Sequence, residues 1–362
     1  MGAAERGMVS PATREHGWAR TVTALLLCLA VAAAPLWPPA AGLTAAFVRA
    51  VLPIEQTMLL VVPALAACAA VGWWAGGRLP LLLAWLALAA WVVLAPLPTQ
   101  ATGYATLARG WALLLAGAFG IVGIVAPGRA FFPRALSTLG LAVGTAFVAL
   151  LVAGRDPGLL SRVMTREYER RVDASLTGWR EHAAQEGWQA VAARSPELAA
   201  RADATAEALE RLPAAVGTLT PALIALEPLA VLALAWSLYH RLSRARLGPP
   251  LGALRTFRFN DQLVWGVVAG AAMLLVPSLA ALRPLGANLL AFFGALYALR
   301  GIGVLRWWAP ERWVALAALG VALLLPVLGV PLLAGSLGVI ALLLGLGDTW
   351  QDWRNRRPRP TA

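Results

Sequence analysis

The chain has 362 residues, of which 60% are hydrophobic and only 13% are charged. Ordinary soluble domains carry about 25% charged residues, so this composition excludes a water-solvated globule. Disorder is excluded as well, because disordered segments lack the apolar residues that a packed core needs. The composition therefore indicates a polytopic membrane protein with an all-α fold.

The net charge of +12 comes from 30 basic residues, all of them Arg, against 18 acidic ones. A protein that binds nucleic acid presents such charge as a basic face on a folded surface. Here the arginines instead interrupt hydrophobic runs, as residues that determine membrane topology do. We therefore expect the lipid bilayer, and no nucleic acid, to be a partner of this chain.

Apolar runs of about 20 residues, the length that crosses a hydrocarbon core, predict the membrane spans. A further apolar stretch, Val314–Leu346, is interrupted by Pro326 and Pro331 and predicts two short helices or one broken helix. The shorter run Ala40–Val51 predicts an interfacial or re-entrant segment. Together these runs predict a transmembrane bundle of 8 to 10 helices. The eight main runs are Thr21–Leu36, Met58–Ala75, Leu81–Leu97, Leu107–Val125, Leu136–Val152, Val216–Tyr239, Leu263–Leu282 and Ala287–Leu305.

The distribution of arginines predicts the orientation of these spans. With the amino terminus inside, 17 arginines of the connections and ends fall in the cytoplasm and three fall outside. This predicts a multi-pass protein of the bacterial inner membrane with both termini in the cytoplasm. The first run follows a leader of 20 residues, which favours an uncleaved helix over a signal peptide. The expected parts are a cytoplasmic segment 1–20, a membrane block 21–153, an extracytoplasmic hairpin 154–213, a second membrane block 214–347 and an Arg-rich tail 348–362.

The predicted hairpin is the one strongly polar part of the chain, with nine Arg and ten Asp or Glu between Arg155 and Leu212. Its first helix repeats apolar residues every four positions, and its second opens with Pro196 and Glu197, a typical helix start. Two interpretations of the hairpin are possible: it packs on the outer surface of the bundle, or it acts as a lid or as a docking element for a partner. The apolar stripes are Leu160, Met164, Tyr168 and Val172, then Leu198, Ala202, Ala206, Leu209 and Leu212.

Two charged residues inside the spans are the candidates for a functional site, because an ionisable group at membrane depth costs several kcal/mol. Glu227 lies near the middle of its span and is followed by Pro228, which loosens the helix. Arg300 lies one turn beyond Tyr297, so both side chains share one helix face. A polar cavity or a proton relay is one interpretation of these groups. The others are an intramembrane ion pair, a protonated Glu227, or an Arg300 that extends to the interface.

Small residues predict close helix contacts, since lipid provides no hydrophobic drive for association. The pairs Gly140 with Gly144 and Gly266 with Gly270 have the required spacing. Glu55 and Asp261 begin their spans, where a carboxylate stabilises a helix amino terminus. Motifs of P-loop ATPases, zinc proteases, thiol oxidoreductases and serine hydrolases do not occur in the sequence. We therefore expect no enzymatic activity, no cofactor and no metal, and any energy-coupling ATPase would be another chain.

Three segments of the carboxyl-terminal third resemble the YybS-like family of bacterial membrane proteins, a domain of unknown function. The segment GANLLAFFGALYALRGIGV, residues 286–304, resembles its Gly-x-Asn-Leu-Leu and Leu-Tyr-x-x-x-Gly pattern. The tail LGLGDTWQDWRNR, residues 344–356, resembles its closing Gly-x-x-Asp and Asp-x-Arg element, and FRFNDQLVW, residues 257–265, fits the same plan. Arg300 stands where relatives commonly have Gln.

The family is similar in hydropathy to the substrate-capture subunits of energy-coupling-factor transporters and to rod-shape proteins of the MreD type. This similarity implies that Asn288 and Tyr297 line a solute pocket, although Asn288 also fits a simple helix-start role. The chain is therefore expected to be a solute-binding or permease subunit, with Glu227, Asn288, Tyr297 and Arg300 facing a small polar solute. The alternative is a noncatalytic envelope scaffold that recruits partner proteins.

Overall fold

The computed structural model describes residues 22–28, 54–95, 103–156, 158–185, 187–242, 247–308 and 331–356. Within these ranges every regular element is a helix, which confirms the all-α class. The runs Thr21–Leu36 and Val314–Leu346 are described in part, and Ala40–Val51 lies outside the described ranges. Among the described residues, five helical segments are long and apolar enough to cross a membrane: Thr57–Trp74, Tyr104–Val125, Phe131–Val152, Pro196–Leu242 and Pro277–Trp308.

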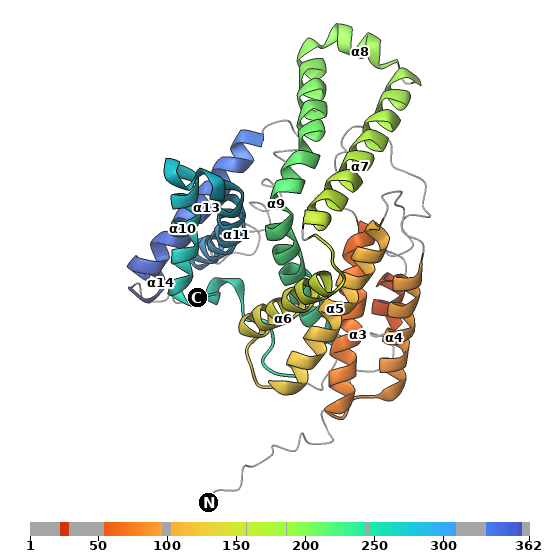
Figure 1. Cartoon of the computed structure of the whole chain (residues 1–362), viewed down its shortest axis with the longest axis vertical. Helices are drawn as coiled ribbons and strands as arrows, with labels where there is room; N and C mark the ends of the chain where they lie inside the picture. The colour runs from red at the N-terminus through yellow and green to blue at the C-terminus, as the bar shows by residue number, and fades with distance from the viewer. Residues whose placement is uncertain are drawn as a thin grey trace, which may run out of the picture. The chain divides into compact units, whose positions relative to one another are not determined.

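The chain divides into two compact units. Among the described residues, unit 1 comprises those up to 163 and the segment 227–251. Unit 2 comprises residues 164–226 and those from 252 onward. The helices that belong to each unit can be followed by colour in Figure 1.

Unit 1 is built around α3 (Ile54–Trp74), which packs against α4 (Leu79–Leu94) and α5 (Tyr104–Val125). Of the 18 residues Thr57–Trp74 of α3, 67% are buried. The corresponding share for the apolar part of α5 is 28%. The helix α6 (Phe131–Val152) packs on α5 and is only 22% buried. A buried α3 and exposed outer helices are what an apolar bundle surrounded by lipid requires, since lipid replaces water as the solvent of the outer faces.

A second buried group in unit 1 surrounds Trp236, near the end of the helix α9 (Pro196–Leu242). The Trp236 ring lies 5.9 Å from the ring of Phe119 and 6.2 Å from that of Phe131. A Cβ at Gly72 would overlap the Tyr239 hydroxyl, so the glycine lets α9 approach α3. The end of α9 therefore packs where α3 and α5 end and α6 begins.

The predicted polar hairpin is formed by α7 (Gly158–Gln185), the short α8 (Trp188–Arg194) and the first half of α9, with α8 at its tip (Figure 1). Val172, Leu176 and Leu209 are its fully buried contacts, with Ala206 and Leu212 beside them. The second helix begins at Pro196, as the sequence predicts. The extracytoplasmic location of the hairpin remains a prediction.

The helix α9 is 47 residues long, so it joins the predicted second hairpin helix and the predicted span Val216–Tyr239 into one element. The expected boundary near residue 213 depends on a change from polar to apolar composition. Such a change interrupts no backbone hydrogen bonds, and the helix continues through it.

The rest of unit 2 departs from the predicted span Leu263–Leu282, which is two elements rather than one. The α-helix α10 (Val264–Leu275) ends at Val276, and a 3-10 helix, η5 (Pro277–Leu282), follows. The cause is Pro277, which donates no backbone hydrogen bond and disfavours the helical conformation of the residue before it. The remaining elements are η3 (Leu254–Thr256), η4 (Asp261–Leu263), α11 (Arg283–Trp308), α13 (Pro331–Gln351) and α14 (Trp353–Arg356).

Glycines set the distance between the helices of unit 2. A Cβ at Gly301 in α11 would overlap the carbonyl oxygen of Ala341, and one at Gly345 in α13 would overlap that of Tyr297. Gly270 likewise faces α11, with the Gly286 oxygen 3.0 Å from the Cβ it lacks. The predicted contact at Gly266 and Gly270 is confirmed. Gly140 and Gly144 in α6 have no described atom within 4 Å of an added Cβ, so they make no such contact among the described residues.

We expect Gly301→Ala to destabilise the packing of α11 on α13 by roughly 1–3 kcal/mol, the usual cost of overpacking. Gly294→Ala is the matched control in the same helix, because an added Cβ there meets no atom within 4 Å. The control should be neutral or stabilising by up to about 1 kcal/mol, since Ala favours helix over Gly. Denaturant unfolding in detergent measures both, and equal stabilities would contradict the close contact.

Candidate functional site

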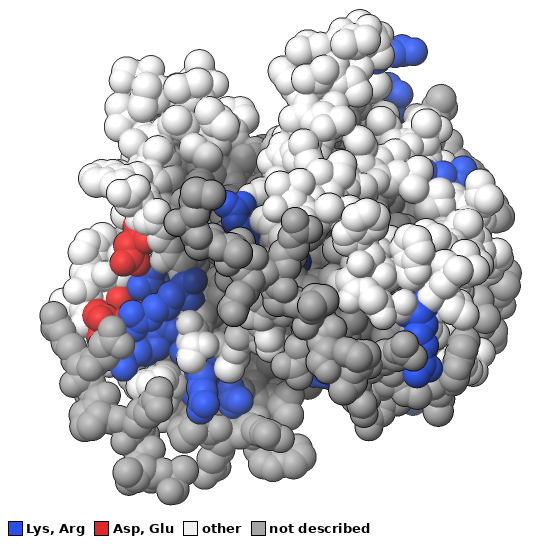
Figure 2. All heavy atoms as spheres, turned by 90° about the horizontal axis from the view of Figure 1, so that it is seen from below, with Lys and Arg blue, Asp and Glu red and all other residues white. Residues whose placement is uncertain are grey.

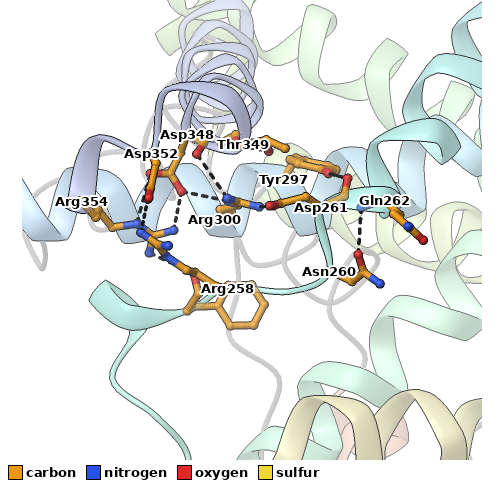
Figure 3. Close-up of polar contacts among 12 residues, drawn as sticks. Arg258, Asn260, Asp261, Gln262, Tyr297, Arg300, Asp348, Thr349, Asp352 and Arg354 are labelled. Carbon is orange, nitrogen blue, oxygen red and sulfur yellow. Dashed lines mark hydrogen bonds and ion pairs between the residues drawn. The ribbon is translucent and has the colours of Figure 1, made fainter. Parts of the chain in front are cut away.

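Segments far apart in the sequence meet at one charged group in unit 2, shown in Figure 3. Arg300 comes from α11, Asp348 from the last turn of α13, and Arg354 from α14. Asp261 opens the short helix η4. We name these four residues the charge cluster.

The end of α13 explains why Arg354 reaches this cluster. Asp352 has a φ of 43°, and among the described residues no other non-glycine residue has a positive φ. Asp and Asn enter this left-handed region more readily than other L residues, because their short side chains bond locally. The turn at Asp352 ends α13 and begins α14, which returns Arg354 to Asp348, six positions earlier.

Asp348 is the centre of the cluster, because its fully buried carboxylate accepts hydrogen bonds from two guanidinium groups. Its Oδ2 atom lies 2.9 Å from Arg300 Nε and 2.5 Å from Arg354 Nη2. Its Oδ1 atom lies 3.3 Å from Arg354 Nε. A buried carboxylate is stable only when it is paired and hydrogen-bonded, and Asp348 meets both conditions.

Arg300 connects this buried centre to the surface. Its side chain is only 3% exposed, yet its Nη1 donates a bond of 2.5 Å to Asp261, whose side chain is 61% exposed. Its Nη2 donates to the backbone oxygen of Asp348 at 3.3 Å. Two carboxylates of unit 2 therefore hold the Arg300 guanidinium in place, and the depth of this group in the membrane stays a prediction.

The loop before α10 is held to the cluster by backbone contacts. Arg354 Nη1 donates to the carbonyl oxygens of Arg255 and Phe257, at 3.1 Å and 3.0 Å. At the rim, Arg258 pairs with Asp352 at 2.6 Å. Three arginines and three aspartates thus take part, and their formal charges cancel.

Aromatic rings enclose one side of the cluster. The Phe259 ring packs edge-on against that of Tyr297, with 5.0 Å between centroids, and the Arg300 guanidinium lies 5.5 Å from the Phe259 centroid. Tyr297 is fully buried, and its hydroxyl lies 3.5 Å from the backbone oxygen of Asp261. Figure 3 shows Tyr297 beside both Asp261 and Thr349.

Asp348 lies outside the five candidate spans, and its protonation state follows from its partners. Burial alone would raise the pKa of Asp348, but the hydrogen bonds from Arg354 and Arg300 outweigh it and lower that pKa below its ordinary value. The group is therefore a carboxylate at neutral pH.

The four predicted site residues lie in different surroundings. Tyr297 and Arg300 share one helix face, as predicted, and both belong to the surroundings of the cluster. Glu227 is half-buried in α9, has an interaction within the described chain, and belongs to unit 1. Asn288 contacts another helix of unit 2.

Asn288 inserts its amide into the backbone of α9. Its Nδ2 donates to Thr218 O at 2.8 Å, and its Oδ1 accepts from Ala222 N at 2.9 Å. These two backbone groups lie one helical turn apart. Asn288 Nδ2 also donates to Pro284 O at 2.8 Å, so its amide joins α11 to the backbone of α9.

Asp348, Arg354 and Asp261 were not predicted as site residues. Asp261 begins η4, but the side chain that caps this helix is Asn260, whose Oδ1 accepts from Gln262 N at 3.0 Å. The carboxylate of Asp261 is thereby left to bind Arg300. The signal in the sequence was the acidic and basic residues of the tail 344–356, which follow an apolar stretch directly.

Comparison with known proteins agrees with a membrane protein. Residues 181–349 match a family described as "Predicted membrane protein (DUF2232)". The matched segment includes Asp261, Arg300 and Asp348 and ends before Arg354. No curated protein and no solved structure matches the chain. The helices and the family match together define a membrane domain of unknown function.

We expect Asp348→Asn to destabilise the protein by about 3–5 kcal/mol, because it leaves two buried guanidinium groups without their carboxylate. Asp352→Asn is the matched control, since it removes an ion pair whose side chains are 38% and 41% exposed. Asn also tolerates the positive φ, so the control should cost at most about 1 kcal/mol. Thermal and denaturant unfolding in detergent distinguish the two. Equal losses would show that Asp348 is no more important than a surface acid.

Proposed function

We propose that the protein is a solute-binding subunit of a membrane transport system, and that Arg300 and Asp261 form its solute contact. The observation that carries this proposal is the unequal accessibility of the two acids that bind Arg300. The Asp348 side chain is 0% exposed, whereas that of Asp261 is 61% exposed.

This asymmetry gives Arg300 one fixed partner and one exchangeable partner. Its Nε bond to Asp348 is buried together with Arg354 and holds the guanidinium in place. Its Nη1 bond to Asp261 lies toward solvent, where a screened ion pair contributes at most about 1 kcal/mol. A solute carboxylate has the geometry of the Asp261 side chain and replaces it at Nη1 without disturbing the buried pairs.

The surroundings support a small, partly apolar solute. Phe259 and Tyr297 provide two aromatic rings next to the exchangeable bond. Pockets for small molecules commonly combine such apolar walls with a few polar groups that fix orientation. An arginine within a candidate span also indicates a role in solute passage, because such charges are costly in lipid.

The resemblance to the YybS-like family supports the same proposal. Its three quoted segments supply Asp261, Arg300 and the pair of Asp348 with Arg354. The distant similarity of that family to substrate-capture subunits favours a subunit that binds solute while a partner chain couples energy. In this proposal the protein lies in the bacterial inner membrane with both termini in the cytoplasm.

We expect Asp261→Asn to increase the affinity for small carboxylates such as acetate and succinate. The variant removes the internal competitor for Arg300, which was an ion pair worth up to about 1 kcal/mol, so the gain should be about two- to fivefold. Calorimetric titration of the purified protein in nanodiscs measures it, with Asp352→Asn as the control that should not change. Unaltered or weaker carboxylate binding by the Asp261 variant contradicts the proposed exchange.

Glu227 provides a second test, directed at transport rather than at binding. We expect Glu227→Gln to abolish uptake of the solute while the protein still inserts and accumulates normally, because a neutral amide keeps the shape and loses the charge. Uptake into proteoliposomes and membrane yield measure the two properties. Uptake that matches the wild type would remove this carboxylate from the mechanism.

The alternative scaffold function is supported by the polar hairpin formed by α7, α8 and the first half of α9. The hairpin has a small apolar core of its own, and its exposed charges form surface pairs such as Arg211 with Glu207. A scaffold of this kind would bind partner proteins through the hairpin and would bind no solute at Arg300. The carboxylate titration therefore distinguishes the two functions.

A further inference from the structure

One end of unit 1 is rich in arginine. Among the described residues, three chain segments lie there: the α3–α4 connection 75–78, the α5–α6 connection with the first turn of α6, 126–134, and the residues 240–242 and 247–251 at and after the end of α9. These described residues contain four arginines and no Asp or Glu. We name this end of unit 1 the basic end.

Contacts show that these segments belong together. Arg134 in α6 donates to Leu247 O at 3.0 Å, His240 Nε2 lies 3.2 Å from Gly248 O, and Trp236 Nε1 donates to Pro249 O at 3.3 Å. Three side chains therefore bind three successive carbonyl groups. The residues 247–249 are therefore fixed against α6 and the end of α9.

Arg134 is a buried cation that no acid neutralises in the described chain. It is 0% exposed, and its Nη2 donates to carbonyl oxygens of Ala126, Pro127 and Arg129 as well as to Leu247. Its Nε and Nη1 atoms are buried and have no hydrogen-bond partner among the described residues. The guanidinium stacks 4.5 Å from the centroid of Trp236. Carbonyl dipoles and an aromatic face hold this charge but do not cancel it.

The acidic residues of unit 1 that the structure describes, Glu55, Asp156 and Glu227, lie away from this end. Glu55 lies in the first turn of α3, and Asp156 follows α6 and pairs with Arg162 at 2.8 Å. Both therefore lie at the opposite ends of helices that run to or from the basic end. Glu227 lies well inside α9, about four turns before the helix ends.

Exposed groups at the basic end provide the contact surface. Arg129 and Arg241 are exposed, and the indoles of Trp73 and Trp74 are 44% and 78% exposed. Tryptophan is typical of the membrane interface, because its ring is amphipathic and sits at headgroup level. Exposed arginines beside exposed indoles match a surface that contacts phosphate headgroups and glycerol backbones together.

The charge cluster of unit 2 provides a comparison within the same chain, because its arginines are paired with acidic residues. There Arg300 and Arg354 are each paired with an aspartate, and so is Arg258 at the rim of the cluster. Figure 2 shows one group of arginine atoms with acidic atoms beside it. The described residues of the basic end contain no acidic partner of this kind.

We propose that the basic end of unit 1 binds the phosphate headgroups of anionic phospholipids, with Arg129 and Arg241 as contacts and Arg134 as the buried source of positive potential. A phosphodiester is the recognised group. A bilayer lipid is the occupant, because the exposed indoles beside the arginines match its interface and would add nothing for free phosphate.

The test compares lipid binding by the full-length protein in neutral detergent, with dioleoylphosphatidylglycerol and dioleoylphosphatidylcholine as probes in native mass spectrometry. The wild type should bind the anionic lipid preferentially. Arg129→Gln with Arg241→Gln should weaken binding of the anionic lipid by about 30-fold, since each arginine near an anionic surface contributes about fivefold. Binding of the zwitterionic lipid should not change.

The matched control is Arg162→Gln with Arg211→Gln, which removes the same charge from arginines already paired with Asp156 and Glu207. This control should bind the anionic lipid as the wild type does. Thermal unfolding of each variant without added lipid verifies that the fold is retained. The proposal is overturned if both double variants lose binding equally, if the wild type prefers neither lipid, or if inorganic phosphate displaces the anionic lipid at equal concentration.

Discussion

The buried carboxylate of Asp348, held between Arg300 and Arg354, is the interaction on which the arrangement of unit 2 depends. It connects α11, α13 and α14, and through Arg354 it also fixes the loop before α10. Burying three charges is expensive unless each finds its partners, and here every guanidinium nitrogen of Arg300 has one. The close glycine contacts of α11 with α13 bring the side chains within reach, so packing and electrostatics depend on each other.

The same interaction gives the proposed site its chemical character. A charge held rigidly by buried partners presents a fixed hydrogen-bond donor to whatever occupies the exposed side. Arg300 has this arrangement, with Asp261 as its accessible partner. The other notable cation, Arg134, is held by carbonyl groups and an aromatic face and keeps its charge. Arg300 is therefore a cation whose charge is paired with carboxylates. Arg134 is a cation that has no acidic partner among the described residues.

Much of the fold could be predicted from hydropathy, because apolar runs of membrane length have few alternatives to helix. The boundaries were less predictable. Pro277 divides one expected span into α10 and η5, and α9 continues through a change of composition that suggested a boundary. Within the site, the shared face of Tyr297 and Arg300 follows from helical spacing. The partner of Arg300 does not, because nothing in a single sequence shows that positions 48 residues apart meet. Asn288 was a plausible pocket residue, yet its amide is used by the backbone of α9.

A double-mutant cycle between Asp348 and Arg354 tests the central claim most directly. The stability of the wild type, Asp348→Asn, Arg354→Gln and the double variant would be measured by denaturant unfolding in the same detergent. If the buried carboxylate holds α14 in place, the two losses are strongly non-additive, with a coupling energy of at least about 1.5 kcal/mol. Losses that add to within about 0.5 kcal/mol would mean that the two side chains do not depend on each other, and that the Asp348 carboxylate does not organise unit 2.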